Sequence, residues 1–358
     1  MDPVVGYLEI LERGFGFLRR IENNFQPSPQ DTFVPAHLIG QLKLGEGVFI
    51  EGRGVEGNGK NTNLKLAKVE TVNGLAPDRH IGIPALQEQT SINPTERFIL
   101  TRAADDHMGR ALDIVVPVGK GQRGLIVSPP KSGKTTILKH MTNAIIDTPP
   151  DTAVFFLLGD ERPEEVTDFK RGVTAGQVLH SSADQSVAQH MRMARLTMNT
   201  AIRLAEIGRD VVVFIDSLTR MSRAFNTDTP SYGRTMTGGL GANALEIPRR
   251  FFGAARNIEN GGSLTVVATI LVDTGSRMDD IIFQEFKGTG NMDLVLSREC
   301  AEQRLWPAIH INDSGTRKEH LLLSAEELQN ATELRRALAG KDQISALNIF
   351  LEHIVSLQ

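Results

Sequence analysis

The stretch that decides the fold spans residues 124–136 and reads Gly-Leu-Ile-Val-Ser-Pro-Pro-Lys-Ser-Gly-Lys-Thr-Thr. Its first half is a short apolar run that predicts a buried strand, and a helix-compatible segment begins at Lys134 and continues to about Asp147. The turn between them is built of small residues. Loop N–H groups and a helix dipole then point toward the same anion, so the stretch predicts a phosphate cradle in an α/β fold.

Two side chains of this cradle have expected roles. Lys134 would reach the β- and γ-phosphates of a nucleotide, and the Thr135 hydroxyl would ligate Mg²⁺. The motif usually begins with Gly or Ala, whereas this chain has Ser128. The alternative is a Gly/Pro turn that carries a solvated lysine.

Composition sets limits on the class of protein. The chain has 358 residues, 40% of them hydrophobic, and no apolar run approaches the roughly 18 residues of a membrane span. Cys300 is the only cysteine, which excludes an internal disulfide and favours a cytoplasmic protein. A formal net charge of −4 gives no global support for nucleic-acid binding, so that claim must rest on local features.

Three regions follow from the distribution of apolar runs. Residues 1–75 carry five short strand candidates and predict a small barrel of the OB or cold-shock type; the candidates are residues 6–11, 14–21, 31–34, 47–52 and 64–72. Residues 76–100 are punctuated by Gly and Pro and form a connector. Residues 101–358 alternate strand and helix patterns, which predicts an α/β domain with a mostly parallel sheet around the P-loop.

Aromatic residues mark one strand of the predicted barrel. Phe15 and Phe17 are two residues apart and so face the same side of a strand. With Phe33 they could form a stacking platform for bases, with Arg19 and Arg20 beside it for phosphate. The alternative is that these rings simply pack in the barrel core.

Two carboxylates follow buried strands in the second domain. Asp216 ends the run at residues 211–215, where a P-loop fold holds the carboxylate for Mg²⁺. Asp160 and Glu161 follow the run at residues 153–158, and Glu161 has the longer reach as a general base for the attacking water. Glu164 and Glu165 are more simply first-turn acids of a helix.

Several arginines lie on glycine-bearing loops. The loops at residues 230–241 and 273–279 each carry one arginine among small and hydroxylated residues, which suits a phosphate backbone or a bland mobile loop. Arg317 lies on a Gly turn outside the nucleotide core and can complete a neighbouring subunit's site in trans. Trp306, the only tryptophan, could stack on a base.

Together these motifs resemble the Rho family of bacterial transcription termination factors over nearly the whole chain. The matching stretches are FGFLR (15–19), GKGQRGLIVSPPKSGKTT (119–136), LGDERPEEVTD (158–168), VVVFIDSLTR (211–220), RRFFGAARNIENGGSLTVVAT (249–269), DTGSRMDD (273–280), FKGTGNMDL (286–294) and SGTRKE (314–319). The resemblance implies a homo-hexameric ring ATPase with a RecA-like P-loop core in residues 101–358, which uses ATP and Mg²⁺. It also implies that the ring moves 5′ to 3′ along nascent RNA and unwinds RNA–DNA hybrids. It also implies RNA polymerase and transcription elongation factors as partners.

The resemblance also implies roles for individual residues. Glu161 is the expected catalytic residue, assisted by Lys131, Lys134 and Arg317, and Thr135 and Asp216 are the expected metal ligands. The implied ATP-binding residues are Gly119, Lys120, Gly121, Gln122, Arg123, Gly124, Pro130, Lys131, Ser132, Gly133, Lys134, Thr135, Thr136, Arg162, Asp216, Arg220 and Trp306. The implied RNA-binding residues are Gly14, Phe15, Gly16, Phe17, Leu18, Arg19, Asp31, Thr32, Phe33, Asn61, Thr62, Asn63, Arg234, Thr235, Met236, Thr237, Gly238, Gly239, Leu240, Gly241 and Arg277.

The sequence departs from the family pattern in the barrel. The stretch Asn61-Thr62-Asn63 stands where the family often has an acidic residue and a tyrosine that shape a cytosine pocket, which puts a preference for cytosine in doubt. The family usually has a small helical subdomain before the barrel, and the resemblance begins at the barrel itself. Two other classes stay open: a rotary or export-type ring ATPase that acts on protein, and a non-catalytic RNA-binding module.

Overall fold

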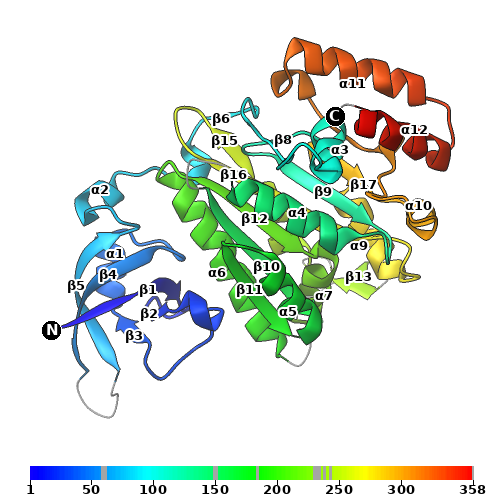
Figure 1. Ribbon diagram of the computed structural model, residues 1–358. Helices are drawn as coiled ribbons and strands as arrows, with labels where there is room; N and C mark the ends of the chain where they lie inside the picture. The colour runs from blue at the N-terminus through cyan, green and yellow to red at the C-terminus, as the bar shows by residue number, and fades with distance from the viewer. Residues whose placement is uncertain are drawn as a thin grey trace.

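A computed structural model describes residues 1–57, 63–147, 152–182, 185–228, 235–236, 239–241 and 244–356. A small barrel lies on one side of a larger α/β domain, and the C-terminal helices lie at the far end (Figure 1). Among the described helices, none combines the length and the apolar character needed to cross a bilayer.

Five strands close the N-terminal barrel in the order β1-β2-β3-β5-β4, as the alternation of apolar residues predicts. The strands are β1 (Asp2–Ile10), β2 (Gly16–Arg19), β3 (Thr32–Val34), β4 (Phe49–Glu56) and β5 (Leu64–Val72), with the short helix α1 (Ala36–Gln41) after β3. Apolar side chains that include Leu8, Leu18 and Ile50 fill the interior. Gly16 is required here, because a Cβ on it would lie 2.3 Å from the Glu9 carbonyl oxygen.

The α/β domain is built on a sheet with the strand order β11-β10-β12-β16-β9-β17-β18, and along this order only the edge strand β18 is antiparallel to its neighbour. Two further short strands, β6 (Ser91–Ile92) and β15 (Arg256–Ile258), join the same sheet by antiparallel pairing through β16. Its strands are β9 (Arg123–Ser128), β10 (Ala153–Glu161), β11 (Gln177–Ser182), β12 (Asp210–Asp216), β16 (Ser263–Leu271), β17 (Met292–Val295) and β18 (Gly315–Thr316). Because the central strands are parallel, their carboxyl ends meet at one edge. That edge carries Ser128, Glu161 and Asp216.

Helices surround the sheet and bury continuous apolar strands such as β12 (Figure 1). They are α3 (His107–Val115), α4 (Lys134–Ile146), α5 (Pro163–Gly172), α6 (Val187–Glu206), α7 (Leu218–Asp228), α8 (Glu246–Gly253), α9 (Arg277–Phe286), α10 (Arg298–Glu302), α11 (Ala325–Leu338) and α12 (Gln343–Ser356). Met193 and Met198 of α6 lie in the core, as the helical periodicity predicts. The RecA-like fold class with an N-terminal barrel is confirmed.

The connector is more ordered than its Gly and Pro content suggests. It contains α2 (Pro77–Ile81), β6 (Ser91–Ile92) and β7 (Arg97–Phe98). β6 pairs with β15 (Arg256–Ile258), and β7 pairs with β8 (Val118–Gly119), so the second half of the connector is part of the α/β domain. Local periodicity could not reveal these two-residue strands, because long-range pairing alone defines them.

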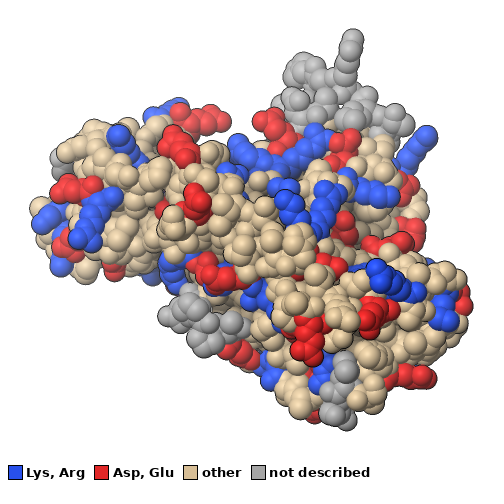
Figure 2. All heavy atoms as spheres, turned by 90° about the horizontal axis from the view of Figure 1, so that it is seen from above, with Lys and Arg blue, Asp and Glu red and all other residues tan. Residues whose placement is uncertain are grey.

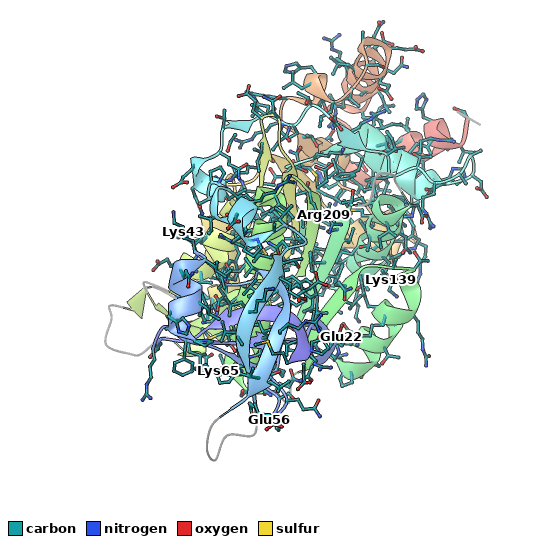
Figure 3. The ribbon with its side chains drawn as sticks, turned by 90° about the vertical axis from the view of Figure 1, so that its left-hand side faces the viewer. Glu22, Lys43, Glu56, Lys65, Lys139 and Arg209 are labelled. Atoms are coloured by element: carbon teal, nitrogen blue, oxygen red, sulfur yellow. The ribbon has the colours of Figure 1, made fainter. Side chains whose placement is uncertain are left out.

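The barrel is packed firmly on the α/β domain. Phe25, which follows β2, is fully buried and belongs to the same apolar cluster as strands β10 and β12. Thr200 of α6 donates to the Gly47 carbonyl oxygen at 3.1 Å. Figure 3 looks onto the barrel, with Lys65 near its lower end and Arg209 of the α/β domain above it.

Candidate nucleotide and RNA sites

The predicted phosphate cradle forms at the carboxyl end of β9. Gly133 is the N-cap of α4 with φ 87°, and no side chain caps the helix, which leaves its first N–H groups directed into the loop. Lys131 also has a positive φ, 64°, and its side chain is exposed. Pro130 and Thr136 are exposed, and Thr135 is half-buried in the first turn of α4.

The serine that starts the loop has a structural explanation. Ser128 and Ser132 are both buried, and their hydroxyl oxygens lie 2.9 Å apart in a hydrogen bond. Ser132 also donates to the Pro129 carbonyl oxygen at 2.8 Å. The two serines therefore close the loop from inside, so Ser128 has a partner that the sequence motif does not reveal.

Lys134 and Asp216 meet at the mouth of the cradle. The Lys134 Nζ lies 2.5 Å from the Asp216 Oδ1 and 3.8 Å from the Glu161 Oε1. Asp216 also accepts a hydrogen bond from Thr269 at 2.7 Å. The structure thus brings together one cation and two carboxylates from β10, β12 and α4, which is the arrangement that the motif spacing predicts.

Glu161 is the most perturbed carboxyl of this cluster. Its side chain is 2% exposed, and both carboxylate oxygens lack a hydrogen-bond partner among the described residues. Burial, followed by the acidic neighbours Glu165 and Asp216, raises its pKa to about 8, against the opposing effect of Lys134 and Arg220. The Arg220 Nη1 lies 3.2 Å from the Glu161 Oε2. A buried carboxyl poised in this way is typical of a general base that awaits its water.

The neighbours of Glu161 on α5 behave differently. Arg162 is highly exposed and reaches Glu165 at 3.9 Å, so its role toward nucleotide stays a prediction. Glu164 and Glu165 lie in the first turn of α5, as expected for acids that favour a helix N-terminus. The Asp160 side chain lies outside the described ones.

Trp306 lies against the phosphate cradle. A Cβ built on Gly133 would lie 2.6 Å from the Trp306 Cζ3, and 42% of the Trp306 surface is exposed. The exposed ring beside the P-loop is where a base could stack. The sequence could not establish this proximity, because 172 residues separate Trp306 from Lys134.

Residues 119–123 lie at the amino end of β9, because Arg123 is the first residue of that strand. The cradle follows the carboxyl end of β9, about 17 Å away along a six-residue strand. Gly119, Gly121 and Gln122 are buried, and Lys120 pairs with Glu96 and Asp210, each at 2.8 Å. Gly124 packs against Met292. This segment therefore lies away from the cradle of its own chain, and its role toward nucleotide stays a prediction.

Arg317 lies at the same amino-terminal edge. Its N–H donates to the Asn291 carbonyl oxygen at 2.9 Å, and the Asn291 N–H donates to the Arg123 carbonyl oxygen at 2.9 Å. Burial, then Arg256 and Arg317, lower the pKa of Arg123. An exposed Arg317 in this cationic group cannot serve the cradle at the opposite edge of its own sheet, so any catalytic role requires a second chain.

The aromatic residues of the barrel form a triad outside its core. Ring centroids are 5.4 Å apart for Phe15 and Phe33, 5.8 Å for Phe17 and Phe33, and 6.0 Å for Phe15 and Phe17. All three rings are half-buried and none belongs to the apolar interior of the barrel. The alternative of simple core packing is therefore wrong. Gly14 is exposed beside them, at φ 81°.

Arg19 is not available for phosphate beside the triad, contrary to the prediction from the sequence. It is 5% exposed, and its guanidinium bonds to Glu9 at 2.6 Å and to Asp31 at 2.5 Å, so it is already neutralised and is not free to meet a phosphate. It lies 4.9 Å from the Phe17 ring centroid, beneath the triad. The Leu18 side chain lies in the barrel core, and Thr32 is buried, which leaves only their backbone for direct RNA contact.

Other predicted RNA-binding residues are only partly described. Asn61, Thr62, Arg234, Thr237 and Gly238 lie outside the described residues. Asn63 donates to the Asp31 carbonyl oxygen at 3.1 Å, beneath the triad.

The two arginine loops lie near each other. Thr235–Met236 forms β13, which pairs with β14 (Leu240–Gly241), where the Leu240 side chain is fully buried. The Met278 Cε lies 3.8 Å from the Cβ position of Gly239, which places the second loop beside the first. Arg277 is exposed at the start of α9.

Three further residues near these sites carry no local sequence motif. Thr269 donates a hydrogen bond to Asp216, and its only signal in the sequence is a hydroxyl residue within the apolar run of β16. Lys65 is exposed and is the Cα partner of Phe33, which places a cation beside the triad (Figure 3). Glu9 is a buried carboxylate beneath the triad, with no local motif to mark it.

The fold and this site define the class of the protein: a RecA-like P-loop ATPase with an N-terminal barrel. The RNA-binding domain of Rho termination factor matches residues 4–78, and the nucleotide-binding domain of the ATP synthase alpha/beta family matches residues 109–316. An ATPase from the type III secretion system of pathogenic bacteria has a similar structure, with a TM-score of 0.61, 26% identity and 70% of each chain covered.

Proteins related in sequence identify the family more specifically than the structural neighbour does. Transcription termination factor Rho of Chromobacterium violaceum is 45% identical over 352 residues, which cover 98% of this chain and 84% of that protein. Its counterpart in Aquifex aeolicus is 46% identical over 354 residues, with 98% and 81% covered. The chain belongs to the family of transcription termination factor Rho. Secretion ATPases, the ring-ATPase alternative, are similar only at a greater distance.

Proposed function

We propose that the protein is an ATP-driven RNA translocase that terminates transcription as a homo-hexameric ring. The observation that carries this proposal is the combination, in one chain, of a hydrolytic cluster of Lys134, Asp216 and Glu161 with an aromatic triad on the barrel surface. A P-loop without a general base would favour a structural nucleotide, and an export ATPase has no need of a stacking platform.

In the proposed reaction, a water oxygen attacks the γ-phosphorus while the bond to the β,γ-bridging oxygen breaks. Glu161 accepts the proton of that water, and its carboxylate lies between the cations Lys134 and Arg220. The N–H groups at the start of α4 and the Lys134 ammonium stabilise the phosphate charge. Before nucleotide binds, Lys134 pairs with Asp216, so phosphate would compete with a carboxylate for this lysine.

A magnesium ion fits the donor set present. The Asp216 carboxylate and the Thr135 hydroxyl offer hard oxygen ligands, and no described group of three or more His, Cys, Asp or Glu side chains forms a metal cage. Mg²⁺ typically takes one or two protein oxygens and completes its shell with phosphates and water. Bound there, it would neutralise charge on the β- and γ-phosphates.

A ring would account for the position of Arg317 and Arg123 at the sheet edge opposite the cradle. In a ring both would face the cradle of the next subunit, where their positive charge suits a triphosphate. In this proposal residues 119–124 contribute to the nucleotide site in trans, and Arg317 compensates the transition-state charge.

RNA would be held at two places on the chain. Bases would stack on Phe15, Phe17 and Phe33, with Lys65 near the phosphates, because base–aromatic stacking is tolerant of sequence. Arg277 and the loop at residues 234–241 would grip the strand during translocation. Positive and negative side chains are interspersed over the face seen in Figure 2, so local features rather than a global basic surface would carry binding.

Acting on nascent RNA, the protein would work in the cytoplasm with RNA polymerase and elongation factors.

Displacement of a labelled DNA strand from an RNA–DNA hybrid with a 5′ single-stranded RNA tail tests this proposal. We expect displacement that requires ATP and Mg²⁺ and is lost in Lys134→Ala. A hybrid with a 3′ tail controls for direction. ATP hydrolysis on the tailed RNA without displacement of either hybrid would contradict the translocase proposal.

A further inference from the structure

Glu9 lies at the junction between the aromatic triad and the ATPase domain. Glu9 of β1 is the Cα partner of Phe17, and Phe17 is the Cα partner of Phe33, so the three residues form one row across three strands. The row lies on the outer face of the barrel. Glu9 is nevertheless 1% exposed, because α6 of the ATPase domain covers it.

Three arginines converge on this single carboxylate. The Glu9 Oε2 accepts from the Arg19 Nε at 2.6 Å, on the barrel side. The Glu9 Oε1 accepts from the Arg192 Nε at 2.8 Å and the Arg195 Nη2 at 3.1 Å, both on α6. One oxygen thus binds the barrel and the other binds the ATPase domain.

The cluster is balanced in charge. Asp31 takes the other side of Arg19 at 2.5 Å, and the Glu46 Oε2 lies 3.3 Å from the Arg195 Nε. The three arginines therefore face three carboxylates. Removing one charge from a buried, balanced cluster costs far more than removing one from a surface ion pair, because the remaining charges stay desolvated.

Each end of the cluster leads to a proposed site. On the barrel side, Arg19 lies 4.9 Å from the centroid of the Phe17 ring. On the ATPase side, α6 packs on β10, which ends in Glu161, and on α7, which carries Arg220. A shift of Arg19 would therefore displace α6, the helix that packs on strand β10, which ends in Glu161.

We propose that Glu9 is a positioning residue that couples occupancy of the aromatic triad to the nucleotide site through α6. The inference rests on the proposed function, since it takes RNA as the occupant of the triad. A base stacked on Phe17 would fix Arg19, Arg19 would fix Glu9, and Glu9 would fix Arg192 and Arg195. Coupling of this kind is reciprocal, so nucleotide would also alter RNA affinity.

The test compares the full-length chain with Glu9→Gln and with the matched control Glu70→Gln. Glu70 belongs to the same barrel and pairs with Arg53 at 2.9 Å, with side chains 40% and 43% exposed. ADP affinity is measured through the fluorescence of Trp306, without RNA and with a saturating cytidine or uridine oligomer of about six nucleotides, near the smaller site sizes of OB folds. Oligomer binding is measured separately by anisotropy.

We expect the oligomer to change the ADP Kd of the wild type and of Glu70→Gln by about 5-fold or more, a typical allosteric coupling. In Glu9→Gln the ratio of the ADP Kd with the oligomer to the ADP Kd without it falls to near one. The ADP Kd of this variant without RNA stays within about 2-fold of the wild-type value. Arg192→Gln, which breaks the cluster from the partly exposed side of α6, gives the same loss and replaces Glu9→Gln if that variant does not fold.

The outcomes separate the two proposals. Wild-type coupling that persists in Glu9→Gln or Arg192→Gln overturns the role of Glu9 and leaves the proposed function standing. Oligomer binding to the wild type without any change in ADP affinity also overturns it. A wild-type chain that binds neither oligomer overturns the proposed function, and this inference with it.

Discussion

At the scale of single residues, the two serines of the P-loop make the most specific departure from the usual motif. Ser128 and Ser132 donate and accept inside a loop that must present its N–H groups to phosphate. A hydroxyl pair buried in this way fixes the loop before nucleotide arrives, which is one route to tighter binding.

A double-mutant cycle on Ser128→Ala and Ser132→Ala tests this role. Each single change removes the bond between the two hydroxyls and leaves the remaining hydroxyl only the Pro129 carbonyl oxygen as a partner. It should cost roughly 1 kcal/mol of stability, whereas the double change should cost less than the sum. We expect the KM for ATP to rise in the single variants with little change in kcat. Additive losses in thermal unfolding would contradict the pairing.

Glu161 makes a prediction about pH. Its pKa is raised to about 8, so the base is increasingly deprotonated as the pH rises toward that value. We expect kcat/KM for ATP to rise from pH 6 to about pH 8, and Glu161→Gln to lose roughly 100-fold or more in turnover. A flat profile over this range in the wild type would exclude Glu161 as the titrating base.

The same shift has a consequence for stability. An unfolded chain loses the Glu161 proton near the ordinary value of 4.5, whereas the folded chain keeps it to about 8, so rising pH between these values disfavours the folded state. Glu161→Gln should therefore gain stability over the wild type as the pH increases from 5 to 8. Melting curves at the two ends of the window measure the difference, and a constant difference would argue against the shift.

At the scale of elements, the turn between β9 and α4 depends on Gly133. Its φ of 87° disfavours any side chain, and a Cβ there would collide with Trp306. Gly133→Ala should weaken ADP binding at least 10-fold and alter the emission of Trp306, the only tryptophan. Gly340→Ala, at a positive φ with open space around it, controls for backbone strain alone.

The elements also show what local sequence can and cannot predict. The P-loop, Glu161 and Asp216 were predictable, because each lies directly after an apolar run whose strand direction fixes the edge. The same rule places residues 119–123 at the opposite edge, because they lead into the apolar run of β9. The burial of Arg19 was not predictable, because it depends on Glu9 and Asp31, which lie on other strands.

At the scale of the whole molecule, a single chain holds the P-loop and Arg317 at opposite edges of its sheet, so the proposed ATPase site would take its two halves from neighbouring chains. Mixing Lys134→Ala subunits with Arg317→Ala subunits tests whether the halves meet between chains. Each variant alone should be inactive, and the mixture should regain part of the turnover, since some interfaces then pair an intact P-loop with an intact arginine. A mixture that stays inactive, although the two variants exchange subunits, would contradict a role for Arg317 in trans.

The central claim is that ATP hydrolysis in this protein is coupled to RNA. Its most direct test is the rate of ATP turnover by the purified protein with poly(C), with poly(U) and without RNA. We expect low ATP turnover without RNA, stimulation by at least one of the polymers, and loss of that stimulation in Lys134→Ala. Turnover that is the same with every RNA as without it would contradict the coupling of ATP hydrolysis to RNA.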